Sequence, residues 1–486
     1  MTIWSNISQR AIETPNQIAI RHENRSITYK DLVTEISNRA DFYASLDGNR
    51  IALCAPNSIE WVVDDLAILK AGKCSIPIPM FFTQQQIIHT LETAAVSHII
   101  ALEGHTNQLT AVPKLRSIDN DAKRVILENA HVPKQSVPNI PANVRKITFT
   151  SGTTGNPKGV MLTESHLYAV LGAVTSRAEI CAKDRHLALS PFSILLENLM
   201  GAWAILMNGA QLFIPHDKST ETSSNPGVSS SQILNLAGKH GITTLILTPL
   251  TLQNLLDAIK DQRVPETMRF CAVGGGKTPL SLIRRALNAG IPVYEGYGLS
   301  ECGSVVALNS TEYNRPGSVG KVLDHTSVVI AEDNEILIVD TEIAKYLGDS
   351  TCEPTRTFRS GDLGTLDSDG YLFIHGRKRN VFITSNGRNV SPEWIEQEYL
   401  GNQHISQLVV FGEGRTENTA VIFSNANDVD VEATIQSTNR LFPDYAKIHS
   451  WIRADRPFSV LNGQMTATGR YRRNNIFQNY KHRLGS

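Results

Sequence analysis

Apolar and polar positions along the first 140 residues alternate between the spacing of helices and that of strands. Residues 31–46 are polar with apolar positions at helical spacing, which predicts an amphipathic helix. After it the pattern predicts in turn a strand, a helix, a short β stretch, a helix and a strand, at residues 50–55, 58–71, 75–79, 84–95 and 98–102. Short runs of Val, Ile and Leu between helices are typical of a parallel sheet flanked by helices. The polar stretch 103–141 predicts a connector.

A second α/β block is predicted after this connector. Residues 144–150 form a strand pattern, a loop rich in glycine and threonine follows, and a long helix begins at about Glu164. Further strand patterns recur between helical ones, at residues 243–247, 270–273 and 292–294. From about residue 317 to 374 the pattern changes to short β runs separated by glycine and aspartate turns, which predicts a small β-barrel-like unit.

The chain starts a new pattern of strand, helix and strand after the basic run 376–379. The remaining ~107 residues have the size of one small domain. The predicted fold is therefore α/β. It has a large N-terminal domain of two α/β sheet subdomains plus a small β-barrel-like subdomain, and a small α+β C-terminal domain. We place the domains at residues 1–377 and 380–486, with a linker near 377–380.

Composition narrows the class of protein but does not name an activity. The 486 residues hold 46 basic and 47 acidic side chains, giving a net charge of −1. This balance argues against a protein that binds nucleic acid or a membrane surface through bulk charge. The most apolar stretch, residues 192–214, is interrupted by Glu197 and other polar residues, so we predict a core segment and no membrane span. With no signal-peptide pattern, the expected location is the cytoplasm.

The most informative motif is the loop that follows the strand at residues 144–150. Its glycines let the backbone approach a ligand closely, its hydroxyls add donors, and Lys158 adds a point charge suited to a polyphosphate. A strand before the loop and a helix after it would place it where α/β sheets bind nucleotides. The residues predicted to bind phosphate are Thr150, Ser151, Gly152, Thr153, Thr154, Gly155 and Lys158.

This loop resembles the phosphate loop of the adenylate-forming superfamily, which includes acyl-CoA synthetases, peptide-synthetase adenylation domains and firefly luciferase. The resemblance extends over nearly the whole chain and implies ATP and Mg²⁺ as cofactors. The run 294–301 resembles the second nucleotide signature of that superfamily, and Glu295 and Gly296 belong to it. By this resemblance Tyr297 stacks on adenine, Ser300 contacts the α-phosphate and Glu301 holds Mg²⁺, as a hard carboxylate ligand can.

Three further motifs resemble those of the same superfamily. Asp362 corresponds to its ribose-binding acid, which can accept hydrogen bonds from two vicinal hydroxyls, and Arg377 would contact ribose or phosphate. The resemblance also makes residues 377–380 a hinge and the C-terminal domain mobile, with Gly387 leaving room for a pantetheine arm. Arg470 stands where the superfamily normally carries the catalytic lysine of adenylation. Lys158, Glu301 and Arg470 are the predicted catalytic residues.

The resemblance also locates the pocket for the acid substrate. Its predicted residues are Phe192, Leu195, Leu196, Thr248, Leu252, Gly274, Gly275 and Gly276. Most of this set is apolar, as an aliphatic or aryl carboxylic acid would require. No aspartate lies between Leu189 and Leu196, where relatives that activate amino acids place one, although Glu197 keeps an amino acid open. The three glycines favour a long chain over a compact aryl acid.

The chemistry implied by the resemblance has two steps. A carboxylate attacks the α-phosphorus of ATP to give an acyl-adenylate, and a thiol then takes the acyl group and releases AMP. The leading hypothesis is a ligase that joins a fatty acid to CoA. One alternative loads the acyl group onto the phosphopantetheine of a holo acyl carrier protein. Two others are an adenylate-binding protein that no longer activates acids, suggested by Arg470, and an amide-forming ligase.

Overall fold

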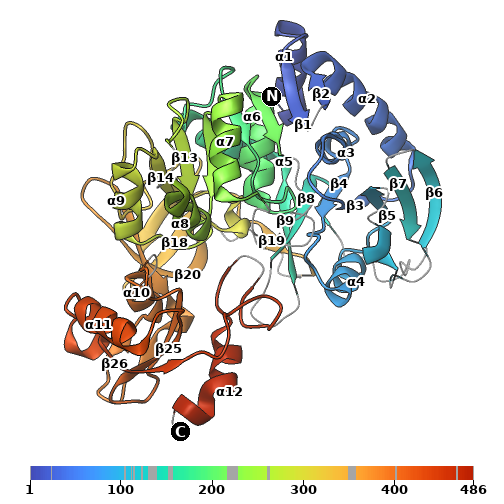
Figure 1. Ribbon diagram of the computed structural model, residues 1–486. Coiled ribbons are helices and arrows are strands. Elements are labelled where there is room, and N and C mark those ends of the chain that lie inside the picture. Colours follow the sequence, from blue (N-terminus) through green and yellow to red (C-terminus); the bar gives the residue numbers. More distant parts are fainter. Residues whose placement is uncertain are drawn as a thin grey trace.

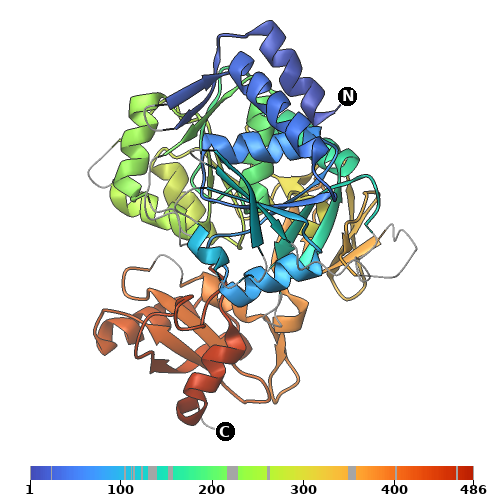
Figure 2. The ribbon, with the colours of Figure 1, turned by 90° about the vertical axis from the view of Figure 1, so that its right-hand side faces the viewer.

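The computed structural model places most of the chain in regular elements (Figure 1). The structure describes residues 2–22, 25–102, 106–110, 112, 115–121, 124–129, 140–150, 157–215, 228–259, 263–348, 357–399, 402–466 and 469–484. Two large sheets form the N-terminal part, and a smaller orange-to-red body carries the C-terminal elements. Figure 2 shows that body below the two sheets in that view.

A nine-stranded sheet carries the strands that later form the binding cavity. Its order is β16-β15-β14-β13-β12-β10-β11-β1-β2, and the strands from β14 to β1 run parallel. Strands β2, β15 and β16 are antiparallel additions at its edges. The strands are β1 (Ile18–His22), β2 (Arg25–Thr28), β10 (Arg185–Leu187), β11 (Gln211–Ile214), β12 (Thr244–Leu247), β13 (Phe270–Val273), β14 (Val293–Tyr297), β15 (Ala307–Leu308) and β16 (Lys321–Val322).

An eight-stranded sheet forms the other N-terminal layer, in the order β19-β9-β8-β4-β3-β5-β7-β6. Its strands are β3 (Arg50–Cys54), β4 (Cys74–Pro77), β5 (His98–Leu102), β6 (Leu115–Asp121), β7 (Arg124–Asn129), β8 (Val144–Thr150), β9 (Lys158–Thr163) and β19 (Lys345–Tyr346). The predicted connector 103–141 therefore contains two strands, β6 and β7, which pair antiparallel at the sheet edge. Its polar residues hid them because an edge hairpin buries few side chains.

The largest hydrophobic core lies between these two sheets. Helices α1 (Ile3–Glu13), α2 (Tyr29–Ser45), α3 (Ile59–Lys70), α5 (Glu164–Arg177) and α6 (Ala204–Met207) contribute to it, with the π-helix η2 (Glu197–Trp203). Asp65 and Lys146 form a fully buried ion pair at 2.7 Å within it. The Asp65 carboxylate also accepts hydrogen bonds from Asn198 and Trp203. This network ties η2 to α3 and β8, because a buried charge must have partners.

The remaining helices of the N-terminal part cover the outer faces of the sheets. They are α4 (Gln84–Thr93), α7 (Ser230–His240), α8 (Pro249–Ala258) and α9 (Leu280–Asn288), with the short turns η1 (Thr106–Leu109) and η4 (Ser300–Cys302). Helices α7, α8 and α9 share a second core with β12 and β13. Residues 216–227 lie outside the described residues, and α7 begins soon after them.

Most strands of the region predicted to be a small β-barrel-like subdomain form a four-stranded antiparallel sheet. Its order is β17-β18-β20-β21, formed by β17 (Ser327–Ile330), β18 (Glu335–Val339), β20 (Thr357–Leu366) and β21 (Leu372–Arg377). The turn η5 (Lys378–Asn380) follows β21 directly. The α/β architecture with a large N-terminal and a smaller C-terminal domain is confirmed.

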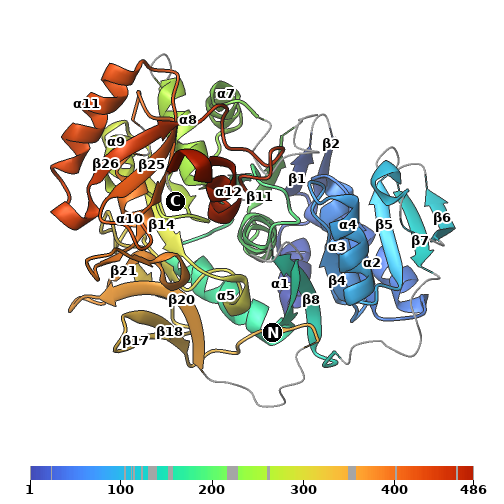
Figure 3. The same ribbon diagram turned by 90° about the horizontal axis from the view of Figure 1, so that it is seen from below.

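The C-terminal domain has its own hydrophobic core around a three-stranded sheet, β24-β25-β26. Figure 3, seen from below, shows α11 on its outer side and α12 nearer the N-terminal elements. The elements are β22 (Phe382–Ile383), β23 (Asn389–Val390), α10 (Pro392–Gln397), β24 (Gln407–Phe411), β25 (Asn418–Phe423), α11 (Asp428–Asn439), η6 (Asp444–Ala446), β26 (Ile448–Arg453) and α12 (Arg473–Leu484).

Candidate active site

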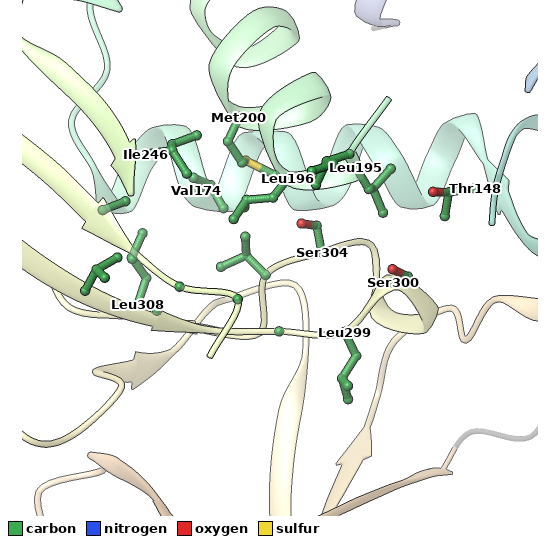
Figure 4. Close-up of a pocket in the computed structure, with 18 of the residues that line it drawn as sticks. Thr148, Val174, Leu195, Leu196, Met200, Ile246, Leu299, Ser300, Ser304 and Leu308 are labelled. Atoms are coloured by element: carbon green, nitrogen blue, oxygen red, sulfur yellow. The ribbon is translucent and has the colours of Figure 1, made fainter. Parts of the chain in front are cut away.

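A cavity of about 290 Å³ lies between the nine-stranded sheet and the helices packed on it (Figure 4). One wall is the sheet face. Successive side chains of a strand point to opposite faces, so alternate residues share this wall. They are Thr244 and Ile246 of β12, Phe270 and Ala272 of β13, and Gly296 of β14. The opposite wall comes from α5, η2 and the segment before η2, through Val174, Ala178, Leu195, Leu196 and Met200.

The mouth of the cavity gathers residues from both predicted nucleotide signatures. Gly274 and Gly275 follow β13, and Tyr297 and Ser300 lie at and after the end of β14. Thr150 also lines the cavity, at the end of β8. Ligands of open α/β sheets bind outside the carboxyl ends of the strands, which is where these residues meet. The structure therefore brings together residues separated by about 150 positions in the sequence.

Asp362 joins Tyr297 to Arg377. The Tyr297 hydroxyl donates a hydrogen bond of 2.7 Å to Asp362 Oδ2, and Arg377 Nε lies 2.6 Å from Asp362 Oδ1. Burial raises the pKa of the Asp362 carboxyl, while Arg377 and the Tyr297 hydroxyl act in the opposite direction. Antiparallel pairing of β20 with β21 places Asp362 directly opposite Arg377. This geometry offers a polar group beside the aromatic face predicted for adenine.

Glu301 and Lys158 both contact one tyrosine that sequence reasoning missed. The Tyr346 hydroxyl donates a hydrogen bond to Glu301 Oε1, and Lys158 Nζ lies 5.5 Å from the centroid of the Tyr346 ring. Strand β19 pairs with β9 and so carries Tyr346 next to the start of β9, where Lys158 lies. Tyr346 belongs to none of the motifs, and no local sequence signal marks it. The Glu301 carboxylate suits Mg²⁺, and the Lys158 ammonium suits the negative charge of a polyphosphate.

The phosphate loop itself differs from the strand–loop–helix arrangement expected for it. It joins β8 to β9, which are antiparallel and pair Thr150 with Lys158, and α5 begins only after β9. The residues from Lys158 onward form a strand because they pair with both β8 and β19. Five predicted phosphate-binding residues, Ser151, Gly152, Thr153, Thr154 and Gly155, lie outside the described residues.

Several residues predicted for the acid pocket lie away from the cavity. Phe192 is buried against Trp61, with ring centroids 5.4 Å apart. Leu252 belongs to the core beneath α8, and the side chain of Thr248 caps that helix by accepting from Thr251 N. Gly276 lies beside Pro249, outside the wall. Leu195, Leu196, Gly274 and Gly275 do line the cavity. The apolar character of these residues in the sequence could not distinguish those of the hydrophobic core from those of the cavity wall.

The C-terminal domain presents Arg470 to the cavity. Arg470 lines the mouth, and its Nη2 donates to the carbonyl oxygen of Gly275 at 3.4 Å. Its charge interacts with those of Arg377, Asp362 and Glu301. Gly387 lies elsewhere, in the turn between β22 and β23 with φ +70°, and is not part of the cavity wall. In this arrangement Arg470, and not the Gly387 turn, lies beside the residues of the nucleotide signatures.

Glu295 is a buried carboxyl next to the cavity. It faces away from Gly296 on β14, and its Oε2 accepts a hydrogen bond of 3.1 Å from Gly317 N. Burial raises its pKa to about 7, against the opposing effects of Gly317 and Lys277. Between pH 4.5 and 7 the folded protein thus retains a proton that the unfolded chain has released. Stability therefore falls as the pH rises through this window.

Replacing Glu295 by glutamine is expected to remove this loss of folding stability at higher pH. Glutamine cannot ionise, and its carbonyl can still accept from Gly317 N. Relative to wild type, E295Q should gain roughly 2–3 kcal/mol of stability between pH 5 and pH 8. Thermal unfolding midpoints of both proteins at the two pH values measure the difference. The exposed control E266Q should show none, and an equal response of wild type and E295Q would contradict the assignment.

Comparison with known proteins decides the family. The model of the AMP-binding enzyme family matches residues 7–342, and that of the AMP-binding enzyme C-terminal domain matches residues 379–485. The chain belongs to the AMP-binding enzyme family. The resemblance to the adenylate-forming superfamily is thereby confirmed, and the chain is an AMP-forming acid–thiol ligase.

Individual relatives show the range of this family. A 2-succinylbenzoate–CoA ligase of Bacillus cereus is 25% identical over 433 residues, covering 84% of each chain. A long-chain-fatty-acid–CoA ligase of Mycobacterium bovis is 27% identical over 432 residues, covering 76% of this chain and 72% of the relative.

Solved structures share the whole fold. The o-succinylbenzoate CoA synthetase of Bacillus subtilis, in complex with its acyl-adenylate intermediate, has a TM-score of 0.79, with 21% identity and 98% of both chains covered. The same enzyme has also been solved with ATP and a magnesium ion, at a TM-score of 0.75, 20% identity and 98% and 99% coverage. In the described part of this chain, no helix combines the length and apolar character needed to cross a bilayer.

Proposed function

We propose that this protein activates a carboxylic acid with an apolar body as the acyl-adenylate, using ATP and Mg²⁺, and transfers the acyl group to CoA. The observation that carries the proposal is the apolar cavity that opens onto both nucleotide signatures. An acid in the cavity would hold its carboxylate at the mouth, next to Gly275, Ser300 and Arg470. Placing the carboxylate beside the α-phosphate there supplies most of what adenylation needs, because positioning and charge stabilisation dominate this chemistry.

The cavity favours an acid with a single carboxylate. Arg470 lies at the mouth, and the described wall behind it carries no lysine or arginine. A second carboxylate, as in 2-succinylbenzoate, would be buried there without a cationic partner, which is costly. A fatty acid, the substrate predicted from the sequence, is one acid of the favoured class. The volume of about 290 Å³ lies at the small end for ligand pockets, so a compact or medium-length body suits it better than a long chain.

Glu301, Tyr346 and Lys158 suit a magnesium-bound polyphosphate. Glu301 would bind the ion, which supplies charge neutralisation to the phosphate oxygens. Lys158 would contact phosphate, and Tyr346 orients both side chains. The Asp362 carboxylate would hold the ribose hydroxyls, and the ring of Tyr297 would lie against adenine.

A domain rotation at residues 377–380 completes the proposal. The separate core of the C-terminal domain, and the family match that begins at residue 379, support a boundary at this point. With Arg470 at the cavity the protein would carry out adenylation. Rotation would withdraw Arg470 and bring the Gly387 turn to the mouth for the thiol step, as alternating domains can.

Acid-dependent exchange of pyrophosphate into ATP tests the first step. A panel of apolar monocarboxylic acids should give exchange well above background, and 2-succinylbenzoate should give less. Failure of every acid would contradict the ligase proposal. AMP release is then measured with free CoA and with a holo acyl carrier protein. If AMP release required the carrier protein, the acyl acceptor would be the carrier protein and not CoA.

Filling the cavity provides a site-specific prediction. Replacing Ile246 by tryptophan places a large ring on the wall that the acid would occupy, so exchange should fall by more than about 10-fold. ATP binding, measured by calorimetry, should remain unchanged because the nucleotide residues are elsewhere. The control L250W adds the same ring to a half-exposed position of α8 and should keep full exchange. If I246W and L250W lost exchange equally, the proposal that the acid occupies this cavity would be contradicted.

A further inference from the structure

The ring of Phe270 closes the deep end of the cavity, away from the nucleotide residues. Phe270 is the first residue of β13, lines the cavity and is 5% exposed. Several of the lining side chains around it are smaller, among them Ala178, Ile180 and Thr244. Gly274, at the mouth, follows Phe270 by four residues, which is about 13 Å of extended chain at roughly 3.3 Å per residue. An acid whose carboxylate lies at the mouth therefore points the far end of its body at Phe270.

Neighbouring strands hold the Phe270 ring in place. The ring stacks on that of Tyr294 in β14, with the centroids 4.5 Å apart and the planes 11° from parallel. On the other side β13 pairs with β12, where Thr244 lies opposite Phe270. Thr244 Oγ1 lies 2.9 Å from His186 Nδ1 and so has a fixed partner of its own. Because close-packed neighbours stand on both sides, the ring has little freedom to move away from a ligand.

Arg269 fixes the backbone that closes the same end. Its guanidinium donates to the carbonyl oxygens of Ala178 and Glu179, each at 3.0 Å. It also forms a two-point ion pair with the Asp184 carboxylate, at 2.7 and 2.6 Å. Such bidentate pairs are strong and specific in geometry. Arg269 precedes β13 and Asp184 precedes β10, so these bonds tie the segment after α5 across the amino ends of the two strands.

An end built from fixed parts gives the cavity a fixed length. Tetrahedral C–C bonds of roughly 1.5 Å advance about 1.25 Å per carbon, and contact with the ring takes up about 3.5 Å of the depth. We propose that Phe270 limits the length of the acid, and that the protein activates straight-chain acids of up to about eight carbons. This inference rests on the proposed function, since it assigns the far end of the same pocket. Phe270 determines specificity by contacting the terminal methyl group and takes no part in the chemistry.

The test measures pyrophosphate exchange with straight-chain acids of graded length. In wild type, kcat/KM should rise about 4-fold with each methylene, the value of one buried CH₂ group. It should then fall at least about 10-fold at the first acid that overlaps the Phe270 ring. F270A removes the ring and should move the optimum to acids longer by at least about two carbons. The preference for the acid two carbons beyond the wild-type optimum, relative to that optimum, should thereby rise by about 100-fold.

Substitutions of graded size keep the test independent of the folding of any one variant. F270L keeps much of the buried volume and should lengthen the optimum by about one carbon, whereas F270W should shorten it by about one carbon. The control F477A removes the same ring from α12, where Phe477 packs against Phe411 outside the cavity wall, and should keep the wild-type optimum. Circular dichroism checks folding. The readout is a ratio between acids, so a general loss of active protein does not imitate the shift.

The outcomes separate this inference from the proposed function. If F270A, F270L and F270W all keep the wild-type optimum while acids support exchange, the ligase proposal stands and the inference about Phe270 is overturned. A wild-type optimum at about twelve carbons or more would also overturn it, because such a chain is too long for the space between mouth and ring. If no acid supports exchange in wild type, the proposed function itself fails and this inference fails with it.

Discussion

Replacing Glu301 by glutamine should reduce pyrophosphate exchange by about 1,000-fold, a loss of ~4 kcal/mol of transition-state stabilisation. The carboxylate of Glu301 is oriented by the Tyr346 hydroxyl, and Tyr346 also stands beside Lys158. An amide has nearly the same shape but no charge, and Mg²⁺ prefers charged oxygen ligands. The variant should therefore keep its fold and lose most of the magnesium dependence.

The experiment measures exchange over a range of Mg²⁺ concentrations for wild type and E301Q. E342Q is the matched control, because Glu342 is an exposed acid on the segment that leads to Tyr346. It should retain full exchange. Y346F removes the hydroxyl that orients Glu301 and should cost about 10-fold, less than loss of the carboxylate itself. If E301Q retained more than a tenth of wild-type exchange, Glu301 would not be the magnesium ligand.

The relation between Glu301 and Tyr346 shows what the sequence could and could not predict. Glu301 was predicted from a motif of consecutive residues, which local sequence preserves. Tyr346 reaches the site only because β19 pairs with β9, and pairing between distant strands leaves no mark in the residues of a two-residue strand. The same reason explains why β9 was missed between the phosphate loop and the helix that was expected from about Glu164.

Asp362, Tyr297 and Arg377 illustrate the opposite case. Each was predicted from its own motif. The pairing of β20 with β21 sets Arg377 opposite Asp362, and Tyr297, at the end of β14, donates to the same carboxylate. The acid pocket lies between these extremes. Leu195 and Leu196 line the cavity, whereas Phe192 packs against Trp61 in the core. A buried apolar side chain looks the same in sequence whether it faces a ligand or another side chain, so only the packing against Trp61 separates them.

A buried polar cluster next to the cavity depends on several separated segments as well. His186, Glu197 and Thr244 come from β10, η2 and β12. The sequence raised Glu197 as a possible partner for an amino group of the substrate. In the structure its two oxygens are occupied by His186 and Ser190, so the carboxylate has a structural partner already. A motif-based interpretation of Glu197 could not anticipate this, because His186 lies eleven residues earlier on another element.

Replacing Arg470 by alanine should lower adenylation by at least about 100-fold and leave the thiol step nearly unchanged. Arg470 lies at the cavity mouth, donates to the Gly275 carbonyl and interacts with the charges of Asp362 and Glu301. A cation fixed there stabilises negative charge that develops on phosphate, which is worth roughly 3 kcal/mol or more in comparable sites. The proposed rotation would remove Arg470 before the thiol attacks, so the second step should not sense the substitution.

The two steps are measured separately. Adenylation is followed by pyrophosphate release in a single turnover, and thioester formation by mixing the enzyme with a supplied acyl-adenylate and CoA. R470K should maintain or raise adenylation, since lysine keeps the charge on a smaller head group. R472A, which removes a neighbouring arginine outside the cavity wall, is the control and should leave both steps near wild type. Equal losses in both steps for R470A would show that Arg470 supports the docking of the C-terminal domain instead of acting on the phosphate. A large drop in R470K would mean that the site has adapted to the planar guanidinium, because the charge alone would then not suffice.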